Sequence, residues 1–222
     1  MTEQHFTSPI KMKSFVWLFL PALVLILFSC GTTKKNETAH YAKAVSAIDS
    51  GNYQAAINYL TTAIDEKEND TSLACLFLLR GEMHEKTGSI DLALADYSEA
   101  MKQNPDDIIP HMKAGNIFNL LSKYDDALNC YNNALKINTN AIDVLIKRAD
   151  IFTATDRDSL AFADLQKVIS LEPENDYAIM SRALIYQRFK EQTKCCEDLE
   201  KAAALGNETA SEFLHSMCGK QK

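Results

Sequence analysis

The sequence predicts an all-α solenoid of about five helix pairs followed by a capping helix. Small and large apolar residues recur about every 34 residues from residue 37 onward. In the clearest copy, Ala93, Tyr97 and Ala100 have the i, i+4, i+7 spacing of one helical stripe. The chain has only 7 Gly and 5 Pro, which leaves little room for turn-rich β architecture. One helix pair cannot bury its apolar face alone, so we expect stacking of successive pairs to stabilise the fold.

The clearest copy spans residues 74–107 and carries a recognisable set of packing and turn residues. These residues are Phe77, Gly81, Gly88, Ala93, Tyr97, Ala100 and Pro105. The pattern resembles the tetratricopeptide repeat, a helix–turn–helix unit of 34 residues. The resemblance implies a right-handed α-solenoid whose usual activity is to bind another protein.

Five copies can be read in register along the chain. The expected repeats are 37–70, 74–107, 108–141, 142–175 and 176–207. Three extra residues separate the first two copies. The fourth copy is looser, because Asp156 and Asp158 replace the turn Gly and the following Tyr. The fifth copy is two residues short and has Cys195 at a position usually taken by Ala.

Residues 208–222 follow the last repeat and predict a capping helix. Ala210, Phe213, Leu214 and Met217 form an i, i+3, i+4, i+7 apolar face, and polar residues fill most of the other side. Such a helix covers the exposed end of a solenoid.

The N-terminus carries the features of an export signal over residues 1–29. Lys11 and Lys13 precede an apolar run from Phe15 to Phe28, which is shorter than a membrane-spanning helix. The run ends in Leu27-Phe28-Ser29-Cys30, which resembles a bacterial lipobox. Uncleaved anchoring and plain secretion are the alternatives, and Met12 is an alternative start.

The lipobox resemblance implies that Cys30 receives a diacylglycerol thioether and becomes the acylated N-terminus. A thiol suits this step because its thiolate is a strong nucleophile. Residues 30–36 would then form the lipidated end and a polar tether. Gly31 follows the cysteine where Asp would favour the inner membrane, so the resemblance implies an outer-membrane protein facing the periplasm.

The cysteines near the C-terminus predict a disulfide that holds the cap. An antiparallel capping helix brings Cys218 level with Cys195 and Cys196, and an oxidising compartment would allow them to pair. We favour Cys196–Cys218 over Cys195–Cys218, since Cys196 should lean toward the following helix. Zinc could accept these thiols with His215, but adjacent cysteines on a helix diverge by about 100°, so we expect no metal.

The family resemblance also implies a ligand groove. In tetratricopeptide arrays the first helices line a concave surface through their second, fifth, ninth, twelfth and thirteenth positions. Those positions, with two neighbouring lysines, give the candidate residues Tyr41, Glu82, Met112, Lys113, Asn116, Asn119, Lys147, Asp150, Tyr177 and Gln187. The Lys and Asn pattern of the family's carboxylate clamp for chaperone tails is missing from this set.

Other function classes have little support. The net charge of −7 disfavours a nucleic-acid partner. No phosphate-binding loop, metalloprotease motif or nucleophile elbow occurs, so we expect neither an enzyme nor a cofactor. The sequence therefore predicts a lipid-anchored scaffold of the cell envelope that binds a protein or peptide. A structural subunit that docks by its convex face, and an accessory receptor for an envelope enzyme or transporter, are the alternatives.

Overall fold

The computed structural model describes residues 39–66 and 72–219, and these residues form eleven helices and no strands. The helices are α2 (Ala39–Asp49), α3 (Tyr53–Asp65), α4 (Leu73–Lys86), α5 (Ile90–Gln103), α6 (Ile108–Leu120), α7 (Tyr124–Ile137), α8 (Ile142–Ala154), α9 (Asp158–Leu171), α10 (Asp176–Arg188), α11 (Gln192–Ala204) and α12 (Glu208–Met217). Among them, no helix has the length and apolar character needed to cross a bilayer.

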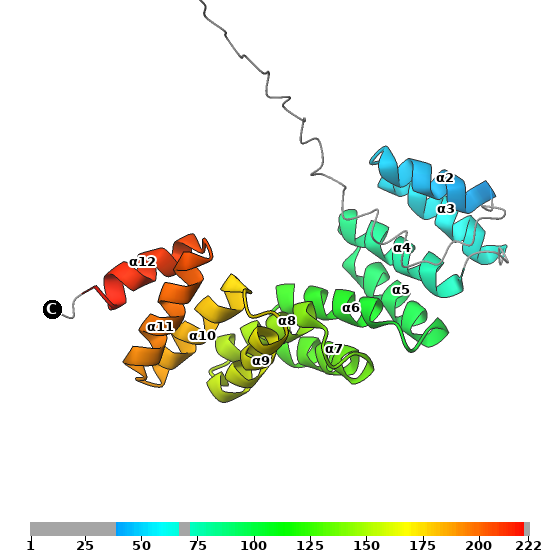
Figure 1. Ribbon diagram of the computed structural model, residues 1–222. Helices are drawn as coiled ribbons and strands as arrows, with labels where there is room; N and C mark the ends of the chain where they lie inside the picture. Colours follow the sequence, from blue (N-terminus) through cyan, green and yellow to red (C-terminus); the bar gives the residue numbers. More distant parts are fainter. Residues whose placement is uncertain (1–38, 67–71, 220–222) are drawn as a thin grey trace, which may run out of the picture.

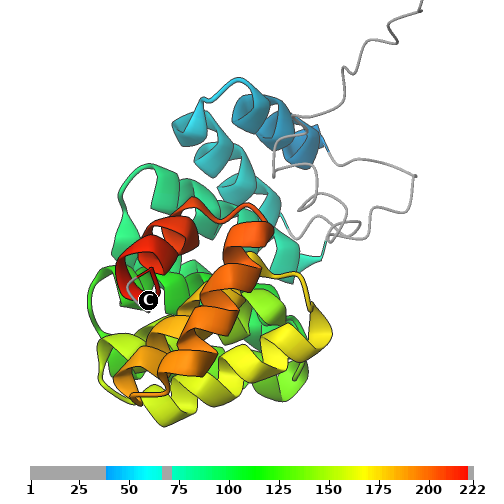
Figure 2. The same cartoon turned by 60° about the vertical axis from the view of Figure 1, so that its left-hand side comes forward.

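The helices follow one another as antiparallel pairs along an arc, which confirms the predicted solenoid (Figure 1). We call α2, α4, α6, α8 and α10 the first helices and their partners α3, α5, α7, α9 and α11 the second helices. The second helices from α5 onward begin at residues 90, 124, 158 and 192, which are 34 residues apart. The capping helix α12 lies beside α11 at the C-terminal end (Figure 2).

Each helix pair is held at close range by a size match between two positions. Gly81 and Gly115 on first helices lie opposite Tyr97 and Tyr131 on second helices. A Cβ atom added at Gly115 would lie 2.6 Å from Cε1 of Tyr131, and one at Gly81 would lie 2.7 Å from Cε1 of Tyr97. The other three pairs have alanine opposite leucine at the same positions. They are Ala44 with Leu60, Ala149 with Leu165, and Ala183 with Leu199, all of them buried.

The turn inside every pair requires a left-handed backbone. The turn residues Gly51, Gly88, Ser122, Asp156 and Lys190 all have positive φ, between 55° and 78°. The amide of the residue that follows then donates to the carbonyl five residues earlier, as from Lys123 to Phe118 at 2.8 Å. These bonds satisfy helix-end carbonyls, and the left-handed conformation costs a side-chain residue about 1–2 kcal/mol. The periodic backbone is thus kept even where the sequence does not supply glycine.

An arginine links successive repeats at three places. Arg80 donates through Nε and Nη2 to the carboxylate of Asp96, at 2.9 and 2.7 Å, and through Nη1 to Thr61 of the preceding second helix at 3.1 Å. The same arrangement recurs around Arg148 with Asp164 and Asn132, and around Arg182 with Asp198 and Gln166. The third repeat has Ala114 and Cys130 at these positions, so it lacks this link.

The size match predicts the result of a substitution at the third pair. Gly115→Ala should destabilise the fold by about 1–2 kcal/mol, because the new methyl group meets a ring that is fully buried and cannot withdraw. The double variant with Tyr131→Leu should recover much of this loss, since it copies the alanine–leucine pairs of the neighbouring repeats. Urea unfolding of the single and double variants measures the coupling. Losses that simply add would contradict the size match.

The turn geometry predicts a stabilising change. Lys190→Gly should raise the free energy of unfolding by about 1 kcal/mol, because glycine accepts the φ of 62° without steric cost. Glu200→Gly is the matched control, an exposed position inside α11, and should lower the same quantity by about 1 kcal/mol. If Lys190→Gly lowered the stability in thermal unfolding, as Glu200→Gly should, the turn would not be under strain.

Candidate functional site

A cavity of about 450 Å³ lies on the side of the solenoid formed by the first helices. Three consecutive first helices supply its lining, which consists of Met112 and Asn116 from α6, Asp143, Ile146, Lys147 and Asp150 from α8, and Tyr177 from α10. Five of the residues selected from the sequence therefore meet in one place: Met112, Asn116, Lys147, Asp150 and Tyr177. They meet because equivalent positions of successive repeats are stacked side by side.

Hydrogen bonds orient the polar groups of this cavity. The Tyr177 hydroxyl donates to Oδ1 of Asp150 at 2.8 Å, and this bond joins the first helices of two repeats. The Tyr131 hydroxyl donates to Oδ1 of Asn116 at 2.7 Å. The carbonyl oxygen of Asn116 is thereby engaged, and its amide N–H groups are the donors that the side chain can offer to a ligand.

Burial raises the pKa values of both Asp150 and Tyr177. Desolvation raises the pKa of Asp150 above its usual value, while the hydrogen bond from Tyr177 and the charge of Lys147 act in the opposite direction. Desolvation and the nearby Asp150 raise the pKa of Tyr177 to about 12. The phenol therefore stays protonated as a donor at neutral pH, and Asp150 is a carboxylate that water solvates poorly.

The structure corrects two of the predicted groove residues. Tyr41 is only 4% exposed and packs in the core formed by α2, α3 and α4, so it does not line a groove. Glu82 is 5% exposed and its Oε1 lies 2.7 Å from Nζ of Lys113. Glu82 and Lys113 therefore act first as an ion pair between the second and third repeats. Family positions mark the side of a helix, but they cannot say which side chains a neighbour will cover.

The remaining predicted residues lie on first helices outside the cavity. Asn119 is half-buried near the end of α6, and Gln187 is exposed near the end of α10. Asp143 was missed in our selection, although it occupies the second position of its repeat, one of those that the family pattern assigns to the groove. The arginine links were also missed, and their signal was an Arg and an Asp 16 residues apart in three repeats.

A second cavity, of about 510 Å³, lies between α7, α8 and α9. Its lining is mostly polar and includes Asn129, Asn132, Asn133, Lys136, Thr139, Arg148, Asp164 and Lys167. Arg148 and Asp164 are already paired here, and Lys167 donates to the backbone oxygen of Thr139. These contacts help to hold repeats three and four together.

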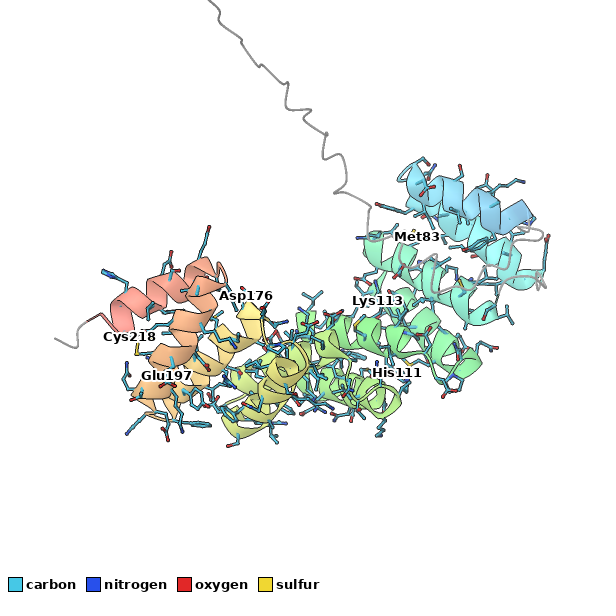
Figure 3. The ribbon with its side chains drawn as sticks, in the orientation of Figure 1. Met83, His111, Lys113, Asp176, Glu197 and Cys218 are labelled. Carbon is cyan, nitrogen blue, oxygen red and sulfur yellow. A yellow bond between two sulfur atoms is a disulfide. The ribbon has the colours of Figure 1, made fainter. Side chains whose placement is uncertain are left out.

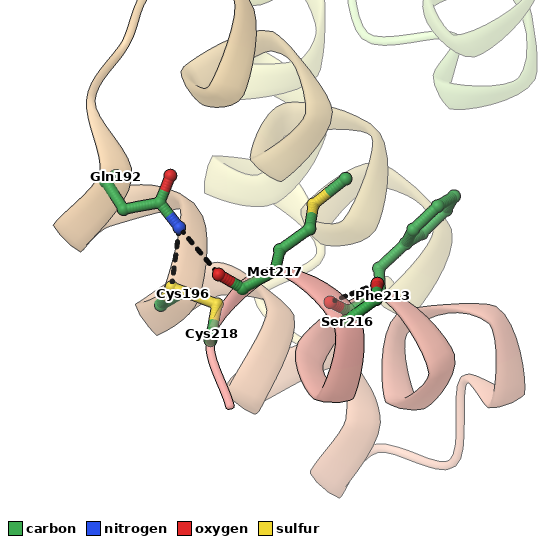
Figure 4. Close-up of a disulfide and its surroundings, with 6 residues drawn as sticks. All are labelled: Gln192, Cys196, Phe213, Ser216, Met217 and Cys218. Carbon is green, nitrogen blue, oxygen red and sulfur yellow. Dashed lines mark hydrogen bonds between the residues drawn. A yellow bond between two sulfur atoms is a disulfide. The ribbon is translucent and has the colours of Figure 1, made fainter. Parts of the chain in front are cut away.

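The C-terminal cap is joined to the last repeat by a disulfide between Cys196 and Cys218, whose Cα atoms are 5.9 Å apart (Figure 4). Gln192 reinforces the same junction, because its Nε2 donates to the Met217 backbone oxygen at 3.1 Å. Cys195 is a free thiol with no exposed surface, and burial raises its pKa. It fills the small-residue position of the repeat. Within residues 39–66 and 72–219, no group of three His, Cys, Asp or Glu side chains is placed to hold a metal ion.

The predicted export signal, the lipidation residue Cys30 and the tether 30–36 lie outside the described residues, as do residues 220–222 of the predicted cap.

Stacked helix pairs with a 34-residue period, small residues at the close approach and a groove along the first helices define the fold of a tetratricopeptide-repeat solenoid. Residues 37–70 match the family model described as "Tetratricopeptide repeat". A human relative, tetratricopeptide repeat protein 6, is 30% identical over 154 residues, which make up 69% of this chain and 22% of that protein. The chain thus matches about a fifth of the length of this much longer relative.

Solved structures support the same fold. A tetratricopeptide repeat protein from Parabacteroides merdae has a TM-score of 0.71 and 18% identity, over 82% of this chain and 73% of that one. A crystal structure of MamA has a TM-score of 0.67 and 15% identity, over 80% of this chain and 99% of that one. At these identities the likeness concerns the arrangement of the helices alone.

Proposed function

We propose that this chain is a protein-binding scaffold of the bacterial cell envelope, anchored by lipid on Cys30, which binds a peptide segment of its partner in the groove of the first helices. Proteins of this fold generally mediate protein–protein interactions, and the fold is typically non-catalytic. The observation that carries the proposal is the cavity shared by α6, α8 and α10. It combines apolar walls with an amide, two carboxylates and a lysine, which suits a peptide backbone and its side chains.

Two features support the envelope location. The Cys196–Cys218 disulfide is the kind of bond that persists in an oxidising compartment such as the periplasm. The sequence Leu27-Phe28-Ser29-Cys30 after a basic and apolar segment supports export and lipidation. Gly31 after the cysteine favours the outer membrane, with the solenoid on the periplasmic side.

A second candidate function is a structural subunit that docks through its second helices. The polar cavity between α7, α8 and α9 favours it, because its three asparagines and Lys136 are exposed on that side. The two functions place the partner on opposite sides of the same helix pairs, so substitutions on each side distinguish them.

Charge reversal in the groove tests where the partner binds. In crosslinking pull-downs from native envelopes, Asp143→Lys and Asp150→Lys should each reduce partner recovery at least tenfold, because both residues line the cavity. Lys136→Glu, in the second-helix cavity, is the matched control and should leave recovery unchanged. Circular dichroism melting confirms that each variant is folded. The reverse pattern would place the partner on the second helices.

Metabolic labelling tests the anchor. Labelled palmitate should enter the wild-type protein and not the Cys30→Ala variant, because the thiol is the attachment point that the lipobox resemblance implies. Cys130→Ala is the matched control, since Cys130 is a free thiol within the repeats, and it should keep the label. Equal labelling of the wild type and Cys30→Ala would rule out the lipid anchor and leave the groove proposal standing.

A further inference from the structure

We propose that the cavity between α6, α8 and α10 selects a cationic side chain, arginine or lysine, in the peptide that binds there. This inference rests on the proposed function and adds the chemical class of the ligand. It follows from the charges of α8, from the exposed ring of Tyr177 and from the way the protein holds its own arginines.

The charged residues of the cavity all come from α8, and carboxylates outnumber cations. Asp143, Lys147 and Asp150 are spaced i, i+4, i+7, so they lie along one face of the helix with two negative charges and one positive charge. An anionic group in the cavity would come close to both carboxylates. A cationic group would be attracted by both, while the exposed Lys147 can turn its flexible chain toward solvent.

The cation position of the preceding repeat shows how this cavity differs. Lys113 occupies the equivalent place in the third repeat and is neutralised by Glu82 of the second repeat at 2.7 Å. The residue equivalent to Glu82 in the third repeat is Asn116, which carries no charge. Lys147 consequently has no ion pair among the described residues. Between repeats two and three, the charges of the groove are therefore already paired. Between repeats three and five, the groove can still bind a charged ligand.

Asp150 has hydrogen-bonding capacity left to use. Its Oδ1 accepts from Tyr177, and a carboxylate offers further acceptor sites on both of its oxygens. Partial burial makes this charge costly to leave unpaired, which agrees with the raised pKa of Asp150. A guanidinium or ammonium donor would satisfy the remaining oxygen with a charge-assisted hydrogen bond.

Tyr177 adds an aromatic surface beside this carboxylate. The residue is 41% exposed, although its hydroxyl is held by Asp150. Aromatic faces attract cations, and the attraction grows when water is excluded. The apolar side chains of Met112 and Ile146 can cover the aliphatic stem of an arginine or lysine. The amide of Asn116 can donate to a backbone carbonyl of the same peptide.

The protein itself uses this combination three times to hold arginine. Each linking arginine pairs with an aspartate and lies over an aromatic ring, with its Cζ 5.5–5.8 Å from the ring centroid. The sets are Arg80 with Asp96 and Phe77, Arg148 with Asp164 and Phe152, and Arg182 with Asp198 and Tyr186. Asp150 and Tyr177 present the same two partners toward the cavity.

Capped pentapeptides test the selectivity directly. The probe has arginine at its centre and two leucines on each side. Matched probes carry citrulline, norleucine or glutamate at the centre. Amide chemical-shift changes in the folded repeat protein, at low ionic strength, give both the affinity and the place of binding. We expect the arginine probe to bind about tenfold more tightly than the citrulline probe, with shifts on α6, α8 and α10. The glutamate probe should bind most weakly.

Two substitutions should move the affinity for the arginine probe in opposite directions. Asp150→Asn should weaken it about tenfold, because the amide removes the negative charge at nearly the same size. Lys147→Gln should strengthen it several-fold, because it removes the competing cation. Glu197→Gln is the matched control, since Glu197 is an exposed carboxylate on α11 (Figure 3), a helix that supplies no residue to the cavity. It should have no effect, and all three variants should keep the wild-type melting temperature.

The outcomes separate this inference from the proposed function. If the four probes bind to the groove with equal affinity, or the glutamate probe binds best, cation selectivity is wrong and groove binding stands. If no probe shifts residues of α6, α8 or α10, the inference is also overturned, and the pull-down experiment decides on the function independently. Opposite effects of Asp150→Asn and Lys147→Gln would establish the selectivity.

Discussion

The structure depends on how closely the two helices of each pair approach. At the closest point a glycine lies opposite a tyrosine in two repeats, and an alanine lies opposite a leucine in the other three. The summed size of the two side chains is similar in all five pairs, which allows a similar close approach in each pair and lets the next pair stack on it. The tyrosines also reach past the interface, since the Tyr131 hydroxyl orients Asn116 and the Tyr97 hydroxyl donates to Glu85 at 2.8 Å. Packing in the interior thereby positions polar groups on the groove side.

The links between repeats use a different interaction, and they are not uniform. In three repeats an arginine is held by an aspartate of its own pair and by a polar side chain of the preceding one. These guanidinium groups are largely buried, with bidentate geometry that satisfies the charges of both partners. The third repeat replaces the pair with Ala114 and Cys130. There the junction with the second repeat uses the Lys113–Glu82 ion pair on the groove side instead. Electrostatic contact thus shifts from one side of the solenoid to the other at this junction.

The position of the Lys113–Glu82 ion pair affects where a ligand can bind in the groove. Between repeats two and three the groove charges neutralise each other, whereas α8 presents Asp143, Lys147 and Asp150 around an open cavity. The cavity lies toward the C-terminal half, where the disulfide of α12 and the arginine links hold the repeats together. A groove of fixed shape loses little conformational entropy when a peptide binds, which favours recognition of a short segment.

The fold class follows from the sequence alone, because small and large apolar residues that recur every 34 residues predict helix pairs that stack on one another. The sequence also indicated Met112, Asn116, Lys147, Asp150 and Tyr177 as groove residues, since equivalent positions of stacked repeats share one side. The packing of the helices settles which of these candidates are accessible. It buries Tyr41 and pairs Glu82 with Lys113, and it adds Asp143 to the cavity. Accessibility depends on what the neighbouring repeat places over a side chain, and that contact is between residues about 30 positions apart. The same reason explains the turn residues, where Ser122, Asp156 and Lys190 adopt a left-handed backbone because the packed helices require it, against their own preference.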